Sequence, residues 1–199
     1  MNKSKPPHND VGDDRRWGTQ CHGLPFAART RIWCGSNWDY SRRDNVRRPP
    51  ESPVLWADLP AGWYLVFANR CDYAENAGLD RLSVDCEVVA CSVEEHVMVS
   101  AASGWKHGRN TWTITHDSQR GREDLEVEGK PPSVFPAIRE RLMAEQAERG
   151  DADYVFDIPV EVAKSLTGFR HDEDIEHAAA APFEVLAAVK TKRWWQIWK

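Results

Sequence analysis

The chain has 199 residues, of which 41% are hydrophobic and 29% are charged, and its formal net charge is −5. A chain of this length can bury a core without disulfides or metal ions, and its composition argues against both a disordered and a membrane protein. No stretch approaches the ~20 apolar residues that cross a bilayer, and the first residues lack the apolar core of a signal peptide. We therefore expect a cytoplasmic protein.

The charge is distributed unevenly along the chain. Residues 1–50 contain ten Lys and Arg against five Asp, so the other 149 residues contain sixteen basic and twenty-six acidic residues, a formal charge of −10. Binding to nucleic acid through this main part is disfavoured, because phosphate recognition needs clustered Lys and Arg. The acidic charge favours a basic protein partner.

The cysteines are odd in number and none forms a CxxC pair. This pattern argues against a disulfide framework and against a thiolate zinc site. We expect reduced, mostly buried thiols and no cofactor. The five cysteines are Cys21, Cys34, Cys71, Cys86 and Cys91.

Residues 1–53 show no sustained apolar period and end in RRDNVRRPPESP, which predicts a flexible basic extension rich in Trp and Arg. Its Trp17, Trp33 and Trp38 lie among arginines, which also fits an arm that contacts nucleic acid or a membrane. The ordered domain is predicted to span residues 54–189.

Two apolar runs of strand length open this domain. Residues 54–59 and 63–68 are separated by the turn-like residues 60–62, and we expect the second run to be a central strand. Residues 71–79 are predicted to form a short helix that ends at Gly78.

Residues 82–128 contain runs of Val, Thr, Ile and Trp separated by Gly, Asn, Ser and Asp clusters, which predicts an antiparallel meander. Alternation along a strand puts Trp112, Ile114 and His116 on one face. The same arithmetic over residues 93–100 puts Val97 and Val99 inside. Six residues of the meander should contribute to the core: Val88, Val97, Val99, Trp112, Ile114 and Val127.

The following segment predicts helices. Ser133 is a suitable N-cap for a helix that runs to about Arg149, with Phe135, Ile138 and Leu142 on its core-facing stripe. Residues 154–158 are predicted to form a strand, and Asp157 precedes a second helix that has Pro159 near its start and stops at Gly168. For residues 182–190 the pattern favours a last strand over a short helix.

Together these elements predict a single α+β domain. We expect a mainly antiparallel sheet of five to seven strands, with the meander at about residues 82–128 and the helices packed on one face. The chain then ends in a cationic, Trp-rich tail, residues 190–199.

The meander also contains the residues that most resemble a catalytic site. Two neighbouring strands could bring an imidazole and a carboxylate within hydrogen-bond reach, as general base catalysis needs. The competing interpretation is structural, with the histidines in half-buried strand positions and the Asp in a turn. No nucleophile elbow and no Gly-rich phosphate loop supports catalysis. The candidates are Glu94, Glu95, His96, His116 and Asp117.

A second cluster offers imidazole and carboxylate groups of the kind that bind divalent metals. Its spacing matches no known metal motif, and a run of like charges is usually a solvated loop, so we predict no metal site here. The cluster consists of His171, Asp172, Glu173, Asp174, Glu176 and His177.

The cationic tail carries Trp194, Trp195 and Trp198. These side chains could pack back onto the domain, insert into a protein partner as anchors, or lie at a membrane interface. Their predicted role is in partner binding.

Our functional prediction is a non-enzymatic, acidic bacterial protein that binds a basic protein partner. In size and charge the chain resembles the general class of toxin-neutralising immunity proteins, and this resemblance implies that the partner would be neutralised. The first alternative is a small hydrolase or metal-dependent enzyme that uses His96, His116 and Asp117. The second is a peripheral membrane or assembly protein that uses the Trp-rich tail.

Overall fold

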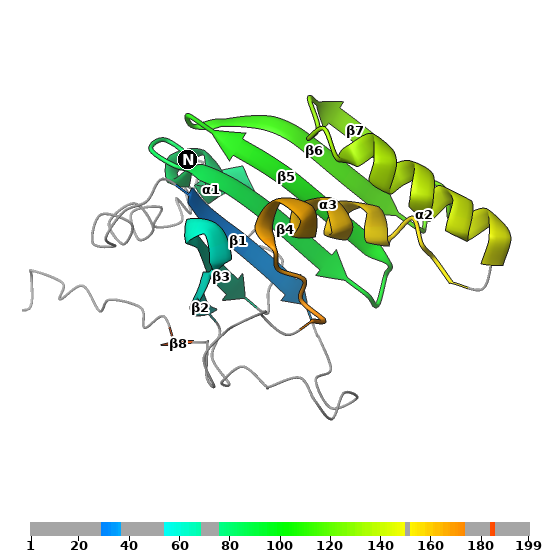
Figure 1. The fold of residues 1–199 in the computed structure, drawn as a ribbon, viewed down its shortest axis with the longest axis horizontal. Helices are drawn as coiled ribbons and strands as arrows, with labels where there is room; N and C mark the ends of the chain where they lie inside the picture. Colours follow the sequence, from blue (N-terminus) through cyan, green and yellow to red (C-terminus); the bar gives the residue numbers. More distant parts are fainter. Residues whose placement is uncertain (1–28, 37–53, 69–75, 150–151, 174–183, 186–199) are drawn as a thin grey trace, which may run out of the picture.

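The computed structural model describes residues 29–36, 54–68, 76–149, 152–173 and 184–185. These residues form one mixed sheet in the order β7-β6-β5-β4-β1-β3-β2-β8, with helices packed against it (Figure 1). The strands are β1 Arg29–Ser36, β2 Val54–Leu59, β3 Trp63–Ala68, β4 Glu87–Glu94, β5 Val99–Lys106, β6 Arg109–Asp117, β7 Glu126–Gly129 and β8 Glu184–Val185. The helices are α1 Asn76–Leu82, α2 Phe135–Arg149 and α3 Asp157–Thr167, and Pro60–Gly62 form the 3-10 turn η3. The α+β class with a mainly antiparallel sheet is confirmed.

Strands β4 to β7 form the predicted meander of antiparallel neighbours. A two-residue turn joins β5 to β6, with φ of 53° at His107 and 70° at Gly108. Positive φ at both central residues is the geometry whose twist matches that of the flanking strands. The hairpin therefore follows from local turn chemistry.

Strand β1 lies where the sequence predicted a flexible extension. It is parallel to both of its neighbours, β3 and β4, and occupies an interior position of the sheet. The prediction that the domain begins only near residue 54 therefore needs correction for Arg29–Ser36. The physical reason is that a parallel strand gains its hydrogen bonds from segments far away in sequence, so its local composition carries little signal. The rest of residues 1–53 lies outside the described residues.

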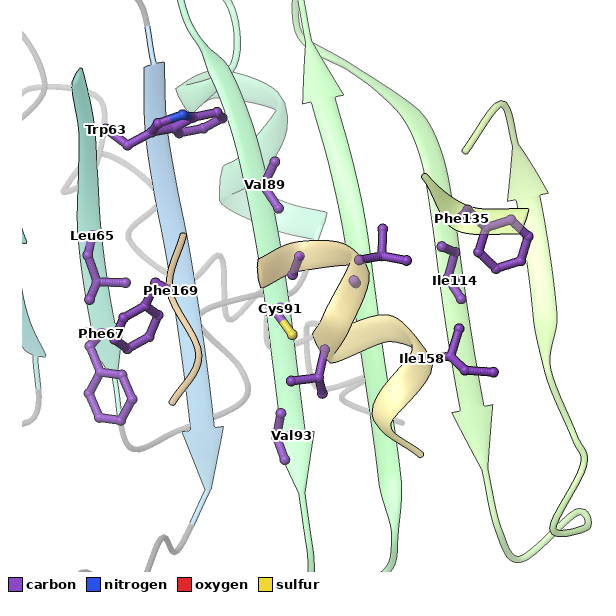
Figure 2. Close-up of a cluster of buried hydrophobic side chains, with 14 of the residues drawn as sticks. Trp63, Leu65, Phe67, Val89, Cys91, Val93, Ile114, Phe135, Ile158 and Phe169 are labelled. Carbon is purple, nitrogen blue, oxygen red and sulfur yellow. The ribbon is translucent and has the colours of Figure 1, made fainter. Parts of the chain in front are cut away.

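The main core lies between the sheet and the pair α2 and α3. Figure 2 shows side chains of β3, β4 and β6 directed toward Ile158 of α3 and toward Phe169, which follows that helix. We call this side of the sheet the helix-covered face. The short helix α1 packs on the opposite face, where Leu79 meets Val88, Ala90 and Trp105, so the prediction that the helices pack on one face holds for α2 and α3 but not for α1. Both faces of β4 are therefore buried, which explains its nearly continuous apolar sequence.

The six predicted core residues divide into two groups. Val88, Trp112 and Ile114 are buried, as predicted. Val99 is half-buried, whereas Val97 and Val127 are 42% and 40% exposed. Val97 was predicted to lie inside a strand, and this prediction was wrong.

The cause is a turn inside the predicted strand 93–100. Strand β4 ends at Glu94, and the chain reverses before β5 begins, with a φ of 54° at Met98. A reversal breaks the period of two, so Ser100 rather than Val99 points into the core. The exposure of Val127 has a different cause, because β7 is the last strand of the sheet.

Helices α2 and α3 were predicted closely. Phe135 and Leu142 of α2 are buried and Ile138 packs against the core. Gly168 ends α3 with a φ of 68°, and its N–H donates to the carbonyl of Lys164 at 2.6 Å, which is the expected left-handed cap.

Three local predictions were less accurate. Helix α1 does not stop at Gly78 but continues to Leu82. Residues 154–158 do not form a strand, because the chain turns there and Ile158 already belongs to α3. Of the predicted last strand 182–190, the described part is β8, which pairs with β2.

Two further observations concern the described residues. Cys91 is buried and Cys86 is half-buried, both as reduced thiols, in line with the sequence prediction. No helix among these residues has the length and apolar character needed to cross a membrane.

Candidate functional site

His116 is the predicted catalytic candidate that lies deepest in the protein. Strand β6 places it on the helix-covered face together with Trp112 and Ile114, as the alternation predicted. The exposed fraction of His116 is 0%. An edge-to-face contact with Phe156, with ring centroids 6.2 Å apart, covers the imidazole from the side of α3.

Both ring nitrogens of His116 are engaged. Nδ1 lies 2.7 Å from the backbone carbonyl oxygen of Asp124, and Nε2 lies 3.2 Å from Oδ2 of Asp153. A carbonyl oxygen can only accept, so Nδ1 carries a hydrogen. The contact at Nε2 pairs the imidazole with the carboxyl group of Asp153, whose side chain is 10% exposed.

This pair fastens the connection between α2 and α3 onto the end of the sheet. The hydroxyl of Ser100, opposite His116 on β5, donates to the carbonyl of Phe156 at 2.7 Å. Arg122 donates to the carbonyl of Ala152 at 2.9 Å from the loop between β6 and β7. Three segments distant in sequence thus meet at His116, and the observed geometry accounts for the imidazole by a structural role.

The other catalytic candidates do not join this pair. Asp117 points to the opposite face of β6, where its carboxylate accepts the N–H of Gln119 at 3.0 Å and stabilises a turn. Glu94 accepts the N–H of His96 at 3.3 Å in the turn between β4 and β5. Glu94 and Asp117 share one row of the sheet, but Val99 of β5 stands between them. Glu94 and Asp117 thus each accept a backbone N–H, and neither contacts the imidazole of His116. The remaining candidates, Glu95 and His96, are exposed in the turn between β4 and β5.

Asp153 is the carboxylate that sequence reasoning missed. It lies 37 positions after His116, in a segment without regular structure between two helices. It also accepts the N–H of Phe156 through Oδ1 at 3.3 Å, so one side chain stabilises both the start of α3 and the imidazole. No spacing rule connects Asp153 to His116, and the sequence offered no signal for the pair.

Two members of the predicted metal cluster form ion pairs with neighbouring basic residues: Glu173 with Lys164 at 2.6 Å and Asp172 with Arg170 at 2.6 Å. The guanidinium of Arg170 also contacts two carboxylates of α3, Asp157 at 2.8 Å and Glu161. Burial raises the pKa of Asp157, and the attraction of Arg170 only partly offsets this effect. Burial also acts to raise the pKa of Asp172, but there the Arg170 and His171 charges prevail and the pKa is lowered. Burial opposes the charge of Arg170, yet the surrounding carboxylates raise its pKa.

This arrangement does not resemble a metal site. Among the residues that the structure describes, no three His, Cys, Asp or Glu side chains lie close enough to hold a metal ion. Nε2 of the buried His171 lies 3.9 Å from Oε1 of Glu95, and the carboxylate of Asp172 is paired with Arg170. Asp174 and His177 lie outside the described residues, and so do Trp194, Trp195 and Trp198 of the tail.

The outermost strand, β7, offers a different kind of surface. All four of its residues are exposed. Glu126 and Glu128 pair with Thr115 and Thr113, so both carboxylates lie on the face opposite α2 and α3. With the exposed Glu123 in the preceding loop, they form a surface that we call the acidic edge.

Gly129 closes this strand with a φ of 69°. A Cβ atom at this position would lie 2.3 Å from the carbonyl oxygen of Thr111, so no larger residue fits without movement of the backbone. The absence of a side chain at Gly129 therefore lets the end of β7 lie close to β6.

Comparison with known proteins gives no further guide to these surfaces. No family model matches the sequence, and neither the curated proteins nor the solved structures contain a significant match.

Proposed function

We propose that this protein is a non-enzymatic domain that binds a basic protein partner through the acidic edge, in the cytoplasm of a bacterium. The observation that carries this proposal is the presence of three exposed carboxylates, Glu123, Glu126 and Glu128, on and beside a fully exposed edge strand. Residues 51–199 contain more acidic than basic residues, which also favours a basic partner.

The geometry of His116 supports a non-enzymatic role. A general base must lie within hydrogen-bond reach of the substrate proton, and an imidazole with an exposed fraction of 0% offers no such approach. Asp117 contributes to a turn, and Asp172 is occupied by Arg170. Contacts within the fold therefore account for His116 and Asp117, two of the three residues on which the enzyme alternative relied.

Arg120 forms an ion pair with one carboxylate of the acidic edge. It contacts Glu126 at 3.0 Å, and the two side chains are 55% and 52% exposed. The side-chain hydrogen bond with Glu126 and the charges of Asp124 and Glu126 raise the pKa of Arg120, so this guanidinium stays charged. Because the pair is open to solvent, a cation of a partner can compete for Glu126, while Glu128 forms no ion pair with the described residues.

The carboxylates alone give selectivity rather than tight binding. An exposed ion pair contributes about 0.2–1 kcal/mol, so three of them contribute about 3 kcal/mol at most. A micromolar complex needs about 8 kcal/mol. Other contacts at the same surface must supply the difference, and the acidic edge acts mainly on partner choice and association rate.

A display selection tests the proposal. We would expose the purified full chain to a library of random peptides and compare the wild type with the double variant Glu126→Gln/Glu128→Gln. The control is Glu140→Gln/Glu148→Gln, which removes the same charge from two exposed positions of α2.

We expect the wild type and the control to enrich peptides rich in Lys and Arg, and the acidic-edge variant to lose this enrichment. Selection without a basic preference, or equal loss in both variants, would contradict the proposal. Metal analysis of the same preparation addresses the enzyme alternative, because a stoichiometric metal ion would argue against a pure binding role.

A further inference from the structure

Strand β7 has only one strand neighbour among the described residues. It pairs with β6 and ends the sheet (Figure 1). The N–H of Lys130 donates to the carbonyl of Thr111 at 3.0 Å, which identifies these two residues as a hydrogen-bonded pair of the ladder. Bonded and non-bonded pairs alternate in an antiparallel ladder. Val127, opposite Ile114, therefore directs its N–H and C=O away from β6 and out of the sheet.

The side chains of β7 add a pattern to this open backbone. Glu126 and Glu128 lie on one face, and Val127 lies on the other with an exposed fraction of 40%. A strand added beside β7 would place its residues directly opposite these three. Its matching sequence is an alternation of basic and apolar side chains.

A second copy of this chain does not match that pattern. Antiparallel pairing of two β7 strands about Val127 would put Glu126 of each copy opposite Glu128 of the other. Four carboxylates would then gather on one face, and like charges directly opposite each other destabilise a strand pair. The glutamates of the acidic edge thus act against self-association while they attract a basic strand.

The cationic tail of the same chain is also a poor occupant. Strands β7 and β8 are at the two ends of the sheet, and seven spacings of about 4.8 Å separate them by about 34 Å. Residues 186–199 follow β8 and span at most about 48 Å when fully extended. Only the last few residues could reach β7, even by the shortest route. Residues 1–53 are basic too, but nowhere in them does an apolar residue stand between two Lys or Arg, so they lack the alternation that β7 selects. The occupant that fits is a separate protein.

We propose that β7 receives an extended basic segment of a partner protein as an additional antiparallel strand, with Lys or Arg opposite Glu126 and Glu128 and an apolar residue opposite Val127. This inference rests on the proposed function and specifies its recognition mode. Backbone hydrogen bonds to Val127 would supply part of the affinity that the carboxylates cannot, and the alternating side chains would supply specificity.

The probe for this inference is the capped peptide Lys-Val-Lys-Val-Lys-Val. Its control is Lys-Lys-Lys-Val-Val-Val, which has the same composition and charge without the alternation. We would titrate each peptide into the full-length protein labelled with ¹⁵N and follow the backbone amide signals.

We expect the alternating peptide to bind about tenfold more tightly than the blocked peptide and to shift the amide signal of Val127. Glu126→Gln/Glu128→Gln should weaken binding by about tenfold, as expected for the loss of two exposed charge contacts. Glu140→Gln/Glu148→Gln should leave it unchanged.

Backbone N-methylation of the peptide tests the hydrogen bonds themselves. In the proposed register the peptide valine opposite Val127 directs its N–H toward β7, whereas the lysine N–H groups point away. Methylation of the valine nitrogens should abolish binding, and methylation of the lysine nitrogens should preserve it. Equal effects of the two modifications, or the reverse order, would overturn the proposed strand pairing.

The outcomes separate this inference from the proposed function. If both peptides bind equally and both lose affinity on Glu126→Gln/Glu128→Gln, the acidic edge binds basic partners but not as a strand. If neither peptide binds, the proposed function and the strand pairing are both contradicted.

Discussion

Replacement of His116 by Ala is the substitution that best distinguishes a structural imidazole from a catalytic one. The change removes two hydrogen bonds, each with a net contribution of about 1 kcal/mol, and leaves Oδ2 of the mostly buried Asp153 without its partner. An orphaned buried group costs about 1–3 kcal/mol, and the cavity beside Phe156 adds to this. We expect a total loss of about 3–5 kcal/mol in the free energy of unfolding.

Urea denaturation measures this loss. With a slope of about 2 kcal/mol per molar urea, the midpoint should fall by about 2 M. The control is His107→Asn in the turn between β5 and β6, where the side chain is exposed and Asn tolerates the positive φ. We expect a change of about 0.5 kcal/mol or less for this control. The structural role would be refuted if the free energy of unfolding of His116→Ala lay within about 1 kcal/mol of the wild-type value. This threshold is about the net contribution of one hydrogen bond.

Asp153→Asn keeps the reasoning testable if His116→Ala does not fold. The amide oxygen of Asn can still accept the N–H of Phe156, and its NH₂ group can donate to Nε2 of a neutral imidazole. We therefore expect Asp153→Asn to lose about 1 kcal/mol or less, and Asp153→Ala to lose about 2–3 kcal/mol. Equal losses for the two variants would contradict a stabilising contact between Asp153 and His116.

Three further predictions concern packing and charge. Gly104→Ala should destabilise the fold by about 1–3 kcal/mol, measured by urea denaturation, because the new Cβ would lie 2.0 Å from Nε1 of Trp112. Asp172→Asn should cost about 1.5–3 kcal/mol at pH 7 through the lost contact with Arg170. Because the folded-state pKa of Asp172 is lowered, its carboxylate stabilises the fold above the unfolded pKa of about 4. This stabilisation is lost as the pH falls through the folded pKa. The difference in unfolding free energy between wild type and Asp172→Asn should therefore shrink on acidification. Asp157→Asn should cost less than Asp172→Asn at pH 7, because the raised pKa of Asp157 means that its ionised form is disfavoured by the fold.

The elements that the sequence predicted well are those whose signal is local and periodic. Strand β3 and helices α2 and α3 each carry their own apolar pattern and end signals. The shared face of Trp112, Ile114 and His116 followed from the period of two alone.

The parts that could not be predicted depend on contacts between distant segments. Strand β1 reads RTRIWCGS and shows no clean alternation, and only its pairing with β3 and β4 makes it a strand. Val97 was misplaced because the turn before β5 interrupts the period of two. Asp153 could not be connected with His116, since tertiary packing alone brings these residues together.

Hydrogen exchange at the amide of Val127 tests the central claim most directly. In the free protein this N–H faces away from β6 and should exchange rapidly. With saturating Lys-Val-Lys-Val-Lys-Val we expect its exchange to slow by at least about tenfold, because a bonded amide exchanges only when the bond opens. Unchanged exchange at Val127, with peptide-dependent protection elsewhere in the domain, would contradict the assignment of the acidic edge as the binding surface.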